Sequence, residues 1–399
     1  MKKLRFKKLP FIIAPILLVL ISSYSFVAVR KPLPPPSVKI SAPATSTQPT
    51  EIPWPDVAQS AVGIKGLGVV AQSDKIEQPR SIASIAKAIT ALAVMNKKPI
   101  TSTADTIITL SAEDEALYRR YVAIGGSTIA VSAGTQLSQY HAIEAMMLPS
   151  ANNMADSLAI WAFGSIEAYN TYANEMVKGY GMNKTTVGGP SGFDDNVLST
   201  ASDVVLLGEK LLENTFLARI VSTKSEMIPG IGLTSNTNQL LGGTYTGIKT
   251  GHTTDAGYCL LLSKTISAGG KEAMLISAVL GAPNSAASFT TSSGLAEAAQ
   301  PHFLDRPVVA KDTVVGTYKE AWGAASEVIA SNTLTSIGWD NSPGQSVSKI
   351  TSPRGPQSDN TVVGTLSIKD YDGAEKSVGL KIKNQVMPPS VWWRLTHYF

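Results

Sequence analysis

The sequence predicts an α/β (α+β) fold in which helices flank an antiparallel sheet and form a helical lobe, followed by a small C-terminal β-sandwich domain. Between residues 56 and 305, helical and strand patterns occur without the regular alternation of a doubly wound parallel sheet. From residue 306 onward, short β-rich runs are separated by Gly, Asn, Asp and Pro, as in small all-β units. The chain of 399 residues is long enough to bury two such cores.

The N-terminal end carries a basic tail and an apolar run. Residues 1–8 hold five Lys and Arg, and Leu9–Val29 is a 21-residue stretch without a charge, about the length that crosses a bilayer. Arg30 and Lys31 follow it. The larger positive charge before the run predicts a cytoplasmic tail, a single-pass anchor in the cell membrane and an extracytoplasmic body. A cleaved signal peptide is the alternative; the length of the run and the lack of a small-x-small site before Arg30 disfavour it.

Residues 30–55 contain eight prolines and no glycine, which predicts an extended polyproline II stalk rather than a folded segment. The globular part then divides into a domain of residues 56–305, which carries the motifs described below, and a C-terminal β-domain of residues 306–399. The C-terminal domain ends in an aromatic tail that contains Trp392, Trp393, Tyr398 and Phe399, which are expected to contact a membrane interface or to pack on the β-domain.

Five helices are expected from apolar residues at helical spacing: Ser84–Met95, Tyr140–Leu148, Asn152–Phe163, Glu167–Tyr180 and Ala201–Leu212. Four strands are expected at Ala61–Ala71, Thr244–Lys249, Gly257–Lys264 and Ala273–Gly281. The turn-rich hexapeptide Thr250–Asp255 is expected to join the second and third of these strands.

Composition excludes several classes of function. The formal charge of +4 comes from the basic N-terminal end, and the chain beyond Lys31 has a formal charge of −3, so no nucleic-acid-binding surface is indicated. Cys259 is the only cysteine, so an intrachain disulfide cannot form. This cysteine is expected to be a buried core residue. The four histidines show no metal-binding spacing, and no metal or organic cofactor is implied.

Three short motifs occur in order along the chain: S-x-x-K at Ser84 and Lys87, S-x-N at Ser150 and Asn152, and K-T-G at Lys249. Each of the first two arises by chance about once in a chain of this length, so neither is specific alone. Ser346-Val347-Ser348-Lys349 and Ser358-Asp359-Asn360 match the same two patterns. Both follow the K-T-G and lie in the β-rich segment, away from any expected helix.

Ser84 lies at the expected start of a strong helix, and a lysine three residues later shares its face. A serine hydroxyl needs an adjacent base to become a nucleophile. Lys87 can serve as that base if its pKa is lowered, which burial and a second cation such as Lys249 would bring about. The alternative is an N-cap serine followed by an exposed lysine.

The second and third motifs have plain alternatives too. Ser150 follows a Leu-Pro pair between two expected helices, where it can relay protons or simply cap a helix. Lys249 and Thr250 at the end of a strand suit a substrate carboxylate, and Gly251 lets a substrate backbone approach closely. A hairpin turn is the alternative for the K-T-G.

The sequence around the motifs resembles the low-molecular-mass penicillin-binding D-Ala-D-Ala carboxypeptidases. The likeness spans about residues 58–305 and is carried by Arg80–Ala91, Met147–Asn153 and Gly247–Tyr258, with support from Gly125-Gly126-Ser127, Ser191–Asp194 and Ile276–Pro283. It implies the penicillin-recognising fold of β-lactamases and transpeptidases. It also implies a serine-type hydrolase that removes the terminal D-alanine of peptidoglycan stem pentapeptides and that β-lactam antibiotics inhibit covalently.

The resemblance implies a catalytic role for three residues: Ser84 as the acylated nucleophile, Lys87 as its base, and Ser150 as the group that returns the proton to the leaving D-alanine. It implies substrate-binding roles for five more, listed here by function: Asn152 for the substrate peptide, Lys249 and Thr250 for the terminal carboxylate, Gly251 for close approach, and the backbone N–H of His252 for the oxyanion together with that of Ser84.

One departure keeps alternatives open. Relatives often have an arginine before the phenylalanine of a segment that follows the last core strand, whereas this chain has Ser288 before Phe289. D,D-endopeptidase activity on cross-linked peptidoglycan is therefore an alternative. A serine β-lactamase is a further one, although Glu209 and Asn214 are one residue too far apart for the class A pattern. A wall-binding module without catalysis is the last.

Overall fold

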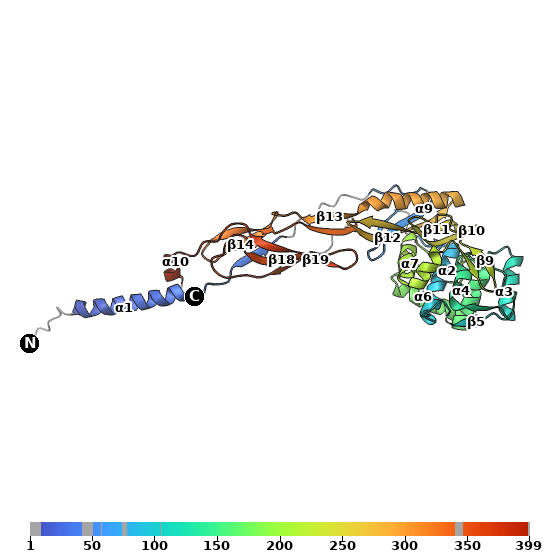
Figure 1. Cartoon of the computed structure of the whole chain (residues 1–399), viewed down its shortest axis with the longest axis horizontal. Helices are drawn as coiled ribbons and strands as arrows, with labels where there is room; N and C mark the ends of the chain where they lie inside the picture. Colours follow the sequence, from blue (N-terminus) through green and yellow to red (C-terminus); the bar gives the residue numbers. More distant parts are fainter. Residues whose placement is uncertain are drawn as a thin grey trace, which may run out of the picture. The chain divides into compact units, whose positions relative to one another are not determined.

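The computed structural model describes residues 9–41, 51–56, 58–73, 78–104, 106–339 and 346–397. The chain forms two compact units (Figure 1). One consists of Gln48–Leu304 with Trp339–Ser342, and the other of Met1–Thr47, Asp305–Gly338 and Pro343–Phe399. The basic tail predicted at residues 1–8, and Tyr398 and Phe399 of the predicted aromatic tail, lie outside the described residues.

The first unit is built on a five-stranded antiparallel sheet with the order β10-β11-β12-β2-β3. Its strands are β2 (Gln59–Ile64), β3 (Gly68–Gln72), β10 (Tyr245–Thr253), β11 (Gly257–Ala268) and β12 (Lys271–Ala282). The three long strands β10, β11 and β12 are adjacent, and the K-T-G motif lies on β10 at the edge of the sheet. The sheet therefore presents Lys249–Gly251 on an edge strand.

Helices cover both faces of this sheet (Figure 1). Gly208 of α7 (Ala201–Glu213) packs directly against Ile276, where even a Cβ atom would lie 3.0 Å from the isoleucine side chain. The next residue, Ser277, bonds through its hydroxyl to the carbonyl of Ser292 in α9 (Ser285–Ala299). Successive strand residues point to opposite faces, so α7 and α9 lie on opposite sides of the sheet.

The remaining helices of this unit form the helical lobe: α2 (Ala86–Lys97), α3 (Ala112–Ala123), α4 (Gln139–Met147), α5 (Asn152–Phe163), α6 (Ile166–Gly179) and α8 (Thr215–Ser222). A 3-10 turn, η2 (Ala83–Ile85), leads into α2. Three short strand pairs complete the unit: β4 (Arg80–Ser81) with β7 (Leu198–Ser199), β5 (Ile107–Thr109) with β6 (Gln136–Ser138), and β8 (Ser225–Ile228) with β9 (Gly232–Ser235). Residues Ala86–Met95 of α2 are all buried, so this helix is the centre of the lobe.

Two sequence predictions for the sheet are wrong. The single strand expected at Ala61–Ala71 is the hairpin β2–β3, because Gly66 and Gly68 adopt φ of +96° and +68° and turn the chain back. The turn expected at Thr250–Asp255 begins later, because β10 keeps its pairing with β11 as far as the pair Thr253 and Gly257.

The second unit is a six-stranded antiparallel sheet with the order β1-β14-β15-β19-β18-β17, accompanied by the strand pair β13–β16. Its strands are β1 (Ser37–Ile40), β13 (Phe303–Val309), β14 (Val314–Lys319), β15 (Ala325–Ala330), β16 (Leu334–Trp339), β17 (Val347–Ile350), β18 (Val362–Lys369) and β19 (Glu375–Ile382). Tyr318, Val328, Val363 and Leu380 are completely buried in its core. The β-rich character predicted for the C-terminal residues is confirmed.

The polyproline stalk predicted for residues 30–55 is wrong for residues 37–40. These residues form β1, which pairs with β14 across the register Ser37–Lys319 to Ile40–Gly316. Val38 and Ile40 alternate along the strand and pack on the core of the C-terminal sheet. The tertiary contact of two β-branched side chains thus overrides the proline-rich composition, and residues 42–50 lie outside the described residues.

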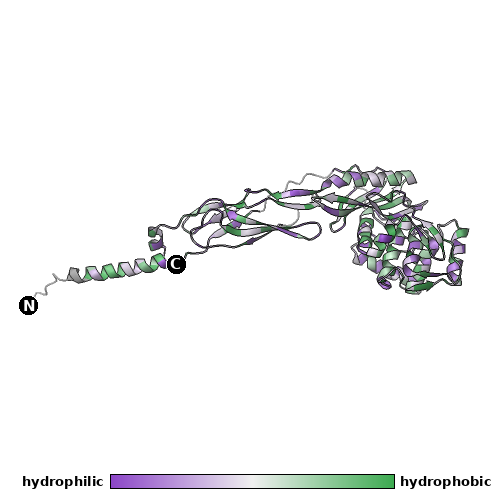
Figure 2. Cartoon of the chain, in the orientation of Figure 1, coloured by the Kyte–Doolittle hydropathy of each residue, from purple (hydrophilic) through white to green (hydrophobic). Residues whose placement is uncertain are grey.

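The apolar run predicted from the sequence forms the helix α1 (Leu9–Arg30), which is apolar along most of its length (Figure 2). The segment Ile13–Arg30 of this helix is, by length and composition, long and apolar enough to cross a membrane. The last helix, α10 (Val391–Thr396), packs against α1, where the Arg394 guanidinium donates a hydrogen bond of 2.6 Å to the carbonyl of Val29. Trp393 packs edge to face on Trp322 of the β-domain, and Trp392 is exposed.

Candidate active site

Ser84 lies in the 3-10 turn η2, immediately before the buried helix α2. The preceding residue, Ala83, has a positive φ of +46°, which is uncommon for a residue with a side chain. Gly192, at φ +69°, packs beneath this turn, and a Cβ there would lie 2.1 Å from the Ala83 carbonyl oxygen. The sharp turn that presents Ser84 therefore depends on a glycine beneath it.

Lys87 is completely buried, and its Nζ atom contacts three oxygen atoms. The distances are 2.8 Å to Ser84 Oγ, 2.7 Å to Asn152 Oδ1 and 2.8 Å to the carbonyl oxygen of Ser191. The first two contacts join the S-x-x-K motif to the S-x-N motif, which is 65 residues further along the chain. The roles that the resemblance implies for the two motifs require them to share a site, whereas no role was assigned to Ser191.

Burial keeps the pKa of Lys87 well below its usual value, and the nearby charge of Lys249 lowers it further. The carboxyl group of Asp156 acts in the opposite direction. A lowered pKa increases the share of the neutral amine, which is the form that a general base requires.

The contacts of Lys87 fix the direction in which a neutral amine points. Asn152 Oδ1 and the Ser191 carbonyl oxygen accept hydrogen bonds and cannot donate them. A neutral amine has two N–H bonds and one lone pair, so both N–H bonds are used by these two acceptors. The lone pair is left for Ser84, whose hydroxyl then donates to the amine. This is the polarity that proton abstraction from the serine needs.

A cleft of about 260 Å³ opens over Ser84. It is called the Ser84 cleft here, and its lining includes Ser84, Ser127, Ser150, Thr237, Thr250, Gly251 and His252. Ser150 lies between α4 and α5 with a positive φ of +63°, and it is buried apart from its side facing the cleft. The three motifs therefore meet around one cleft: Ser84, Ser150 and Thr250 line it, and the buried Lys87 bonds to both Ser84 and Asn152.

Strand β10 forms another wall of the Ser84 cleft. A Cβ atom on Gly251 would lie 2.9 Å from the Ile82 carbonyl and 3.1 Å from the backbone nitrogen of Ser84, so only glycine allows β10 to pass this close. The Thr250 hydroxyl is hydrogen bonded to that of Thr237 at 2.6 Å. The imidazole of His252 stacks on Tyr258 with a centroid distance of 4.0 Å, and both residues line the cleft.

Lys249 is buried beside this wall, and its ammonium nitrogen lies 3.1 Å from the Thr250 carbonyl. Burial lowers the pKa of Lys249 to about 7. A ligand carboxylate in the cleft would favour the charged form of this lysine. The charge of Lys249 thus lowers the pKa of Lys87, while burial lowers the pKa of Lys249 itself.

Cys259 and Ser288 also line the Ser84 cleft. Cys259 is free and buried, as predicted, and burial raises the pKa of its thiol to about 11, which makes it a poor nucleophile. The Ser288 hydroxyl donates to the carbonyl of Ser285 within α9. The position where relatives often carry an arginine therefore faces the cleft with a hydroxyl that is already bonded to its own helix.

Sequence reasoning assigned no role to four residues around the site, although Ser127 belongs to one of the segments that support the resemblance. Thr237 and Ser127 line the cleft, and Ser127 accepts a backbone hydrogen bond from Asn152. Tyr121 and Asp156 form a buried pair behind Lys87. Asn152 and Asp156 are four residues apart on one helix, a spacing that places both on one face and could have drawn attention to the aspartate.

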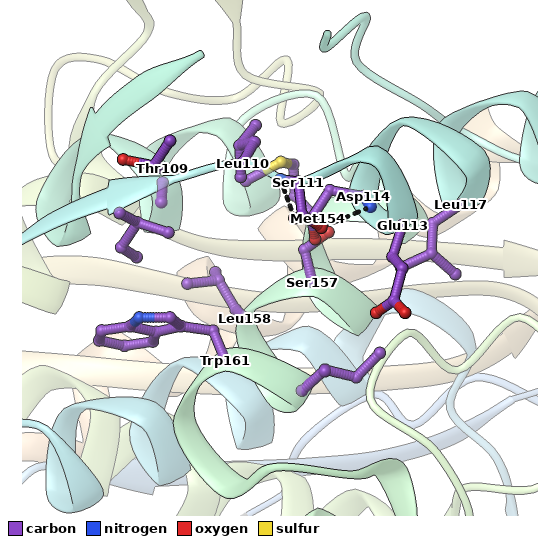
Figure 3. Close-up of a pocket in the computed structure, with 13 residues that line it drawn as sticks. Thr109, Leu110, Ser111, Glu113, Asp114, Leu117, Met154, Ser157, Leu158 and Trp161 are labelled. Carbon is purple, nitrogen blue, oxygen red and sulfur yellow. Dashed lines mark hydrogen bonds between the residues drawn. The ribbon is translucent and has the colours of Figure 1, made fainter. Parts of the chain in front are cut away.

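A second pocket, of about 210 Å³, lies between β5, α3 and α5 (Figure 3). Met154, Leu158 and Trp161 of α5 supply much of its apolar lining. Ser111 and Asp114 on its rim are hydrogen bonded to each other in the capping box of α3. The eight residues predicted for the site are all absent from the described lining of this pocket, so it is separate from the Ser84 cleft.

Replacement of Gly192 by alanine is expected to destabilise the protein by at least about 2 kcal/mol, because alanine is strained at this φ and its Cβ would overlap the Ala83 carbonyl. Urea unfolding of the full-length protein measures the change. Gly294→Ala is the control: it lies inside α9 with open space around it, and there alanine is expected to stabilise by up to about 1 kcal/mol. Equal effects of the two substitutions would contradict the proposed packing.

The free energy of unfolding is expected to depend on pH through the buried Lys249. Its pKa is about 7 in the folded protein, against about 10.4 when unfolded, so between these values the unfolded state binds more protons and stability rises with pH. Lys249→Met is expected to flatten this rise by up to about 2 kcal/mol between pH 7 and 9, as measured by urea unfolding. Lys178→Met, at an exposed position on α6, is expected to leave the slope unchanged; an unchanged slope in Lys249→Met would refute the assignment.

Known proteins resemble this chain over the same region. Residues 51–284 match the D-alanyl-D-alanine carboxypeptidase family. The chain is 29% identical over 208 residues, 51% of each chain, to the D-alanyl-D-alanine carboxypeptidase DacC of Escherichia coli. It is 28% identical over 195 residues to a D-alanyl-D-alanine endopeptidase of Pseudomonas aeruginosa, covering 47% of this chain and 60% of that one. The chain spans about half the length of the curated relatives it matches.

The crystal structure of the D-alanyl-D-alanine carboxypeptidase DacD from Francisella tularensis has the same fold. It aligns with a TM-score of 0.59 and 21% identity over 87% of this chain and 97% of that chain. This likeness confirms the predicted fold class, in which a helical lobe accompanies an antiparallel sheet and further antiparallel strands follow at the C-terminus.

Proposed function

Because this chain belongs to the D-alanyl-D-alanine carboxypeptidase family, we propose that it removes the terminal D-alanine from peptidoglycan stem pentapeptides through an acyl-enzyme on Ser84. The observation that carries the proposal is the 2.8 Å contact between the buried amine of Lys87 and the hydroxyl of Ser84, in a cleft that Ser150 and the K-T-G strand also line. The proposed partners are the stem peptide as substrate and β-lactam antibiotics as covalent inhibitors.

In the proposed acylation, Ser84 Oγ attacks the carbonyl carbon of the penultimate D-alanine and its proton passes to Lys87. The backbone N–H groups of Ser84 and His252 hold the oxyanion that forms. When the tetrahedral species collapses, the peptide bond breaks. Ser150 donates its proton to the nitrogen of the leaving D-alanine and takes the proton held by Lys87 in its place. Water then hydrolyses the Ser84 ester and frees the enzyme.

Substrate binding is assigned to the buried polar groups around the cleft. Asn152 holds the peptide and at the same time the Lys87 amine. Lys249 and Thr250 take the terminal carboxylate. Gly251 lets β10 pass close to Ser84, because a Cβ there would meet Ile82 and Ser84 rather than the substrate. Ser288 supplies no positive charge, so the carboxylate depends on Lys249 more heavily than it would beside an arginine.

Mass spectrometry of a muropeptide pentapeptide after incubation with the full-length protein tests the proposal. The expected product has lost one alanine. An intact pentapeptide together with cleaved cross-linked dimers would favour D,D-endopeptidase activity, the second candidate, which Ser288 and the similarity to the Pseudomonas aeruginosa endopeptidase support. Rapid turnover of penicillin would favour a β-lactamase, and lack of any penicillin adduct a wall-binding module without catalysis.

We also propose that α1 is an uncleaved anchor that holds the rest of the chain on the outer side of the cell membrane. The length and apolar character of Ile13–Arg30 and the excess of basic residues before the helix support this orientation. N-terminal sequencing of the protein from membranes tests it: a chain that begins at Met1 is expected, and a mature N-terminus near residue 30 would identify a signal peptide.

A further inference from the structure

We propose that Asp156, held in place by Tyr121, is a positioning residue that stabilises the ammonium group formed when Lys87 takes the proton of Ser84. The inference rests on the proposed function, because it concerns the protonation of the base in that reaction. It assigns a role in the reaction to two residues outside the three sequence motifs.

The two side chains form a buried pair in the helical lobe. The Tyr121 hydroxyl, from the last turn of α3, donates a hydrogen bond of 2.8 Å to Asp156 Oδ2. Tyr121 is 2% exposed and Asp156 is 7% exposed, so the bond is shielded from water. A buried carboxylate costs free energy unless it has hydrogen-bond or charged partners. The Tyr121 hydroxyl is one such partner of Asp156.

Asp156 is directly connected to the site through its own helix. It lies four residues, about one helical turn, after Asn152 on α5, and the Asn152 side chain bonds to Lys87. The same face of α5 therefore contributes first a neutral acceptor and then a carboxyl group to the surroundings of Lys87. Asp156 acts on the charge of Lys87 in the direction that favours the ammonium form.

Tyr121 also lies close to Ser191, whose loop bonds to Lys87. Its hydroxyl lies 3.5 Å from Ser191 Oγ, and the Ser191 carbonyl accepts a hydrogen bond from Lys87. Phe193 packs edge to face on the Tyr121 ring at 5.6 Å. Gly126 is needed beside it, because a Cβ there would lie 2.9 Å from both the Tyr121 ring and Asn152 Nδ2.

The titratable groups that face Asp156 come from three elements. Asp156 faces Lys87 on α2, Arg120 and Tyr121 on α3, and Asp194 in the loop after Ser191. Burial raises the pKa of Asp156 to about 6, while Tyr121 and Lys87 act to lower it. The carboxyl group is thus largely ionised at neutral pH.

The negative charge of Asp156 is expected to favour the proton transfer from Ser84 to Lys87. Proton transfer from Ser84 creates a cation at Lys87 in a buried site beside Lys249, which disfavours it. Asp156 is the anionic group that opposes both effects. Its loss is expected to keep Lys87 neutral down to lower pH and at the same time to make it a weaker base.

The test is the pH dependence of acylation by a fluorescent penicillin, measured on full-length protein. Acylation requires neutral Lys87, so its rate rises with pH through the pKa of that lysine. In Asp156→Asn this rise is expected about one pH unit lower than in the wild type, with a plateau three- to tenfold lower. Tyr121→Phe is expected to shift the rise in the same direction by less, because Asp156 without its hydrogen bond is ionised less readily.

Glu144→Gln is the matched control. It removes another buried carboxyl group of the lobe, whose surroundings are Tyr140, Glu226 and Arg219, and it is expected to leave the profile unchanged. If Asp156→Asn fails to fold, Tyr121→Phe alone decides. A lower plateau without a shift of the rise, or a shift to higher pH, would overturn the inference. A wild-type protein that is not labelled at all would instead overturn the proposed function.

Discussion

Replacement of Ser84 by alanine is expected to abolish both penicillin labelling and the release of D-alanine, with a fall in activity of at least about 10³-fold. Ser84 lines the cleft with its hydroxyl in contact with the buried amine of Lys87. Alanine removes the only atom proposed to form the covalent bond and leaves the backbone N–H of the oxyanion hole in place. Labelling with fluorescent penicillin and mass spectrometry of the pentapeptide measure the loss.

Ser346→Ala is the matched control for this substitution. Ser346 and Lys349 repeat the S-x-x-K spacing in the C-terminal domain, where Val347–Ile350 form the strand β17. Lys349 therefore lies on a strand that Ser346 directly precedes, and this pair lacks the helical turn that brings Ser84 and Lys87 together. Wild-type labelling is expected of Ser346→Ala, and loss of labelling in both variants would show that the assignment of the nucleophile is wrong.

Replacement of Lys87 by methionine is the second change with a large expected effect. Methionine has a similar length and no lone pair that can accept the serine proton, so acylation is expected to slow by about 10²- to 10⁴-fold. The rate constant for labelling with penicillin measures this. The thermal midpoint is measured alongside, because Asn152 Oδ1 and the Ser191 carbonyl lose a donor in this variant.

Lys97→Met serves as its control on the same helix. Lys97 is exposed in the last turn of α2, and its replacement is expected to change neither the rate nor the fold. Acylation of folded Lys87→Met at the wild-type rate would mean that another group accepts the proton of Ser84.

Local patterns were sufficient to predict the helices that carry the site. Helix α5 begins at Asn152, as predicted, because the Leu-Pro-Ser segment before it ends α4 and redirects the chain. The apolar repeat of α2 predicted its burial. The roles that the family resemblance implies require the three motifs to share a site, and Lys87 joins two of them. These features depend on short stretches of sequence and on one recognisable family pattern.

What the sequence did not predict depends on contacts between distant segments. Helix α9 is rich in Ser and Thr and contains Gly294, a composition that favours helices weakly; it forms where it packs on β11 and β12. Strand β1 exists because the C-terminal sheet offers β14 as a partner. Tyr121 and Asp156 meet only through the packing of α3 on α5, and neither lies in a motif.

The most direct test of the account is to identify the residue that reacts. Full-length wild-type protein is treated with penicillin and digested, and the modified peptide is sequenced by tandem mass spectrometry. A single stable adduct on Ser84 is predicted. An adduct on Ser150, on Ser346 or on another residue, or the recovery of unmodified Ser84 from protein that carries the label, would contradict it.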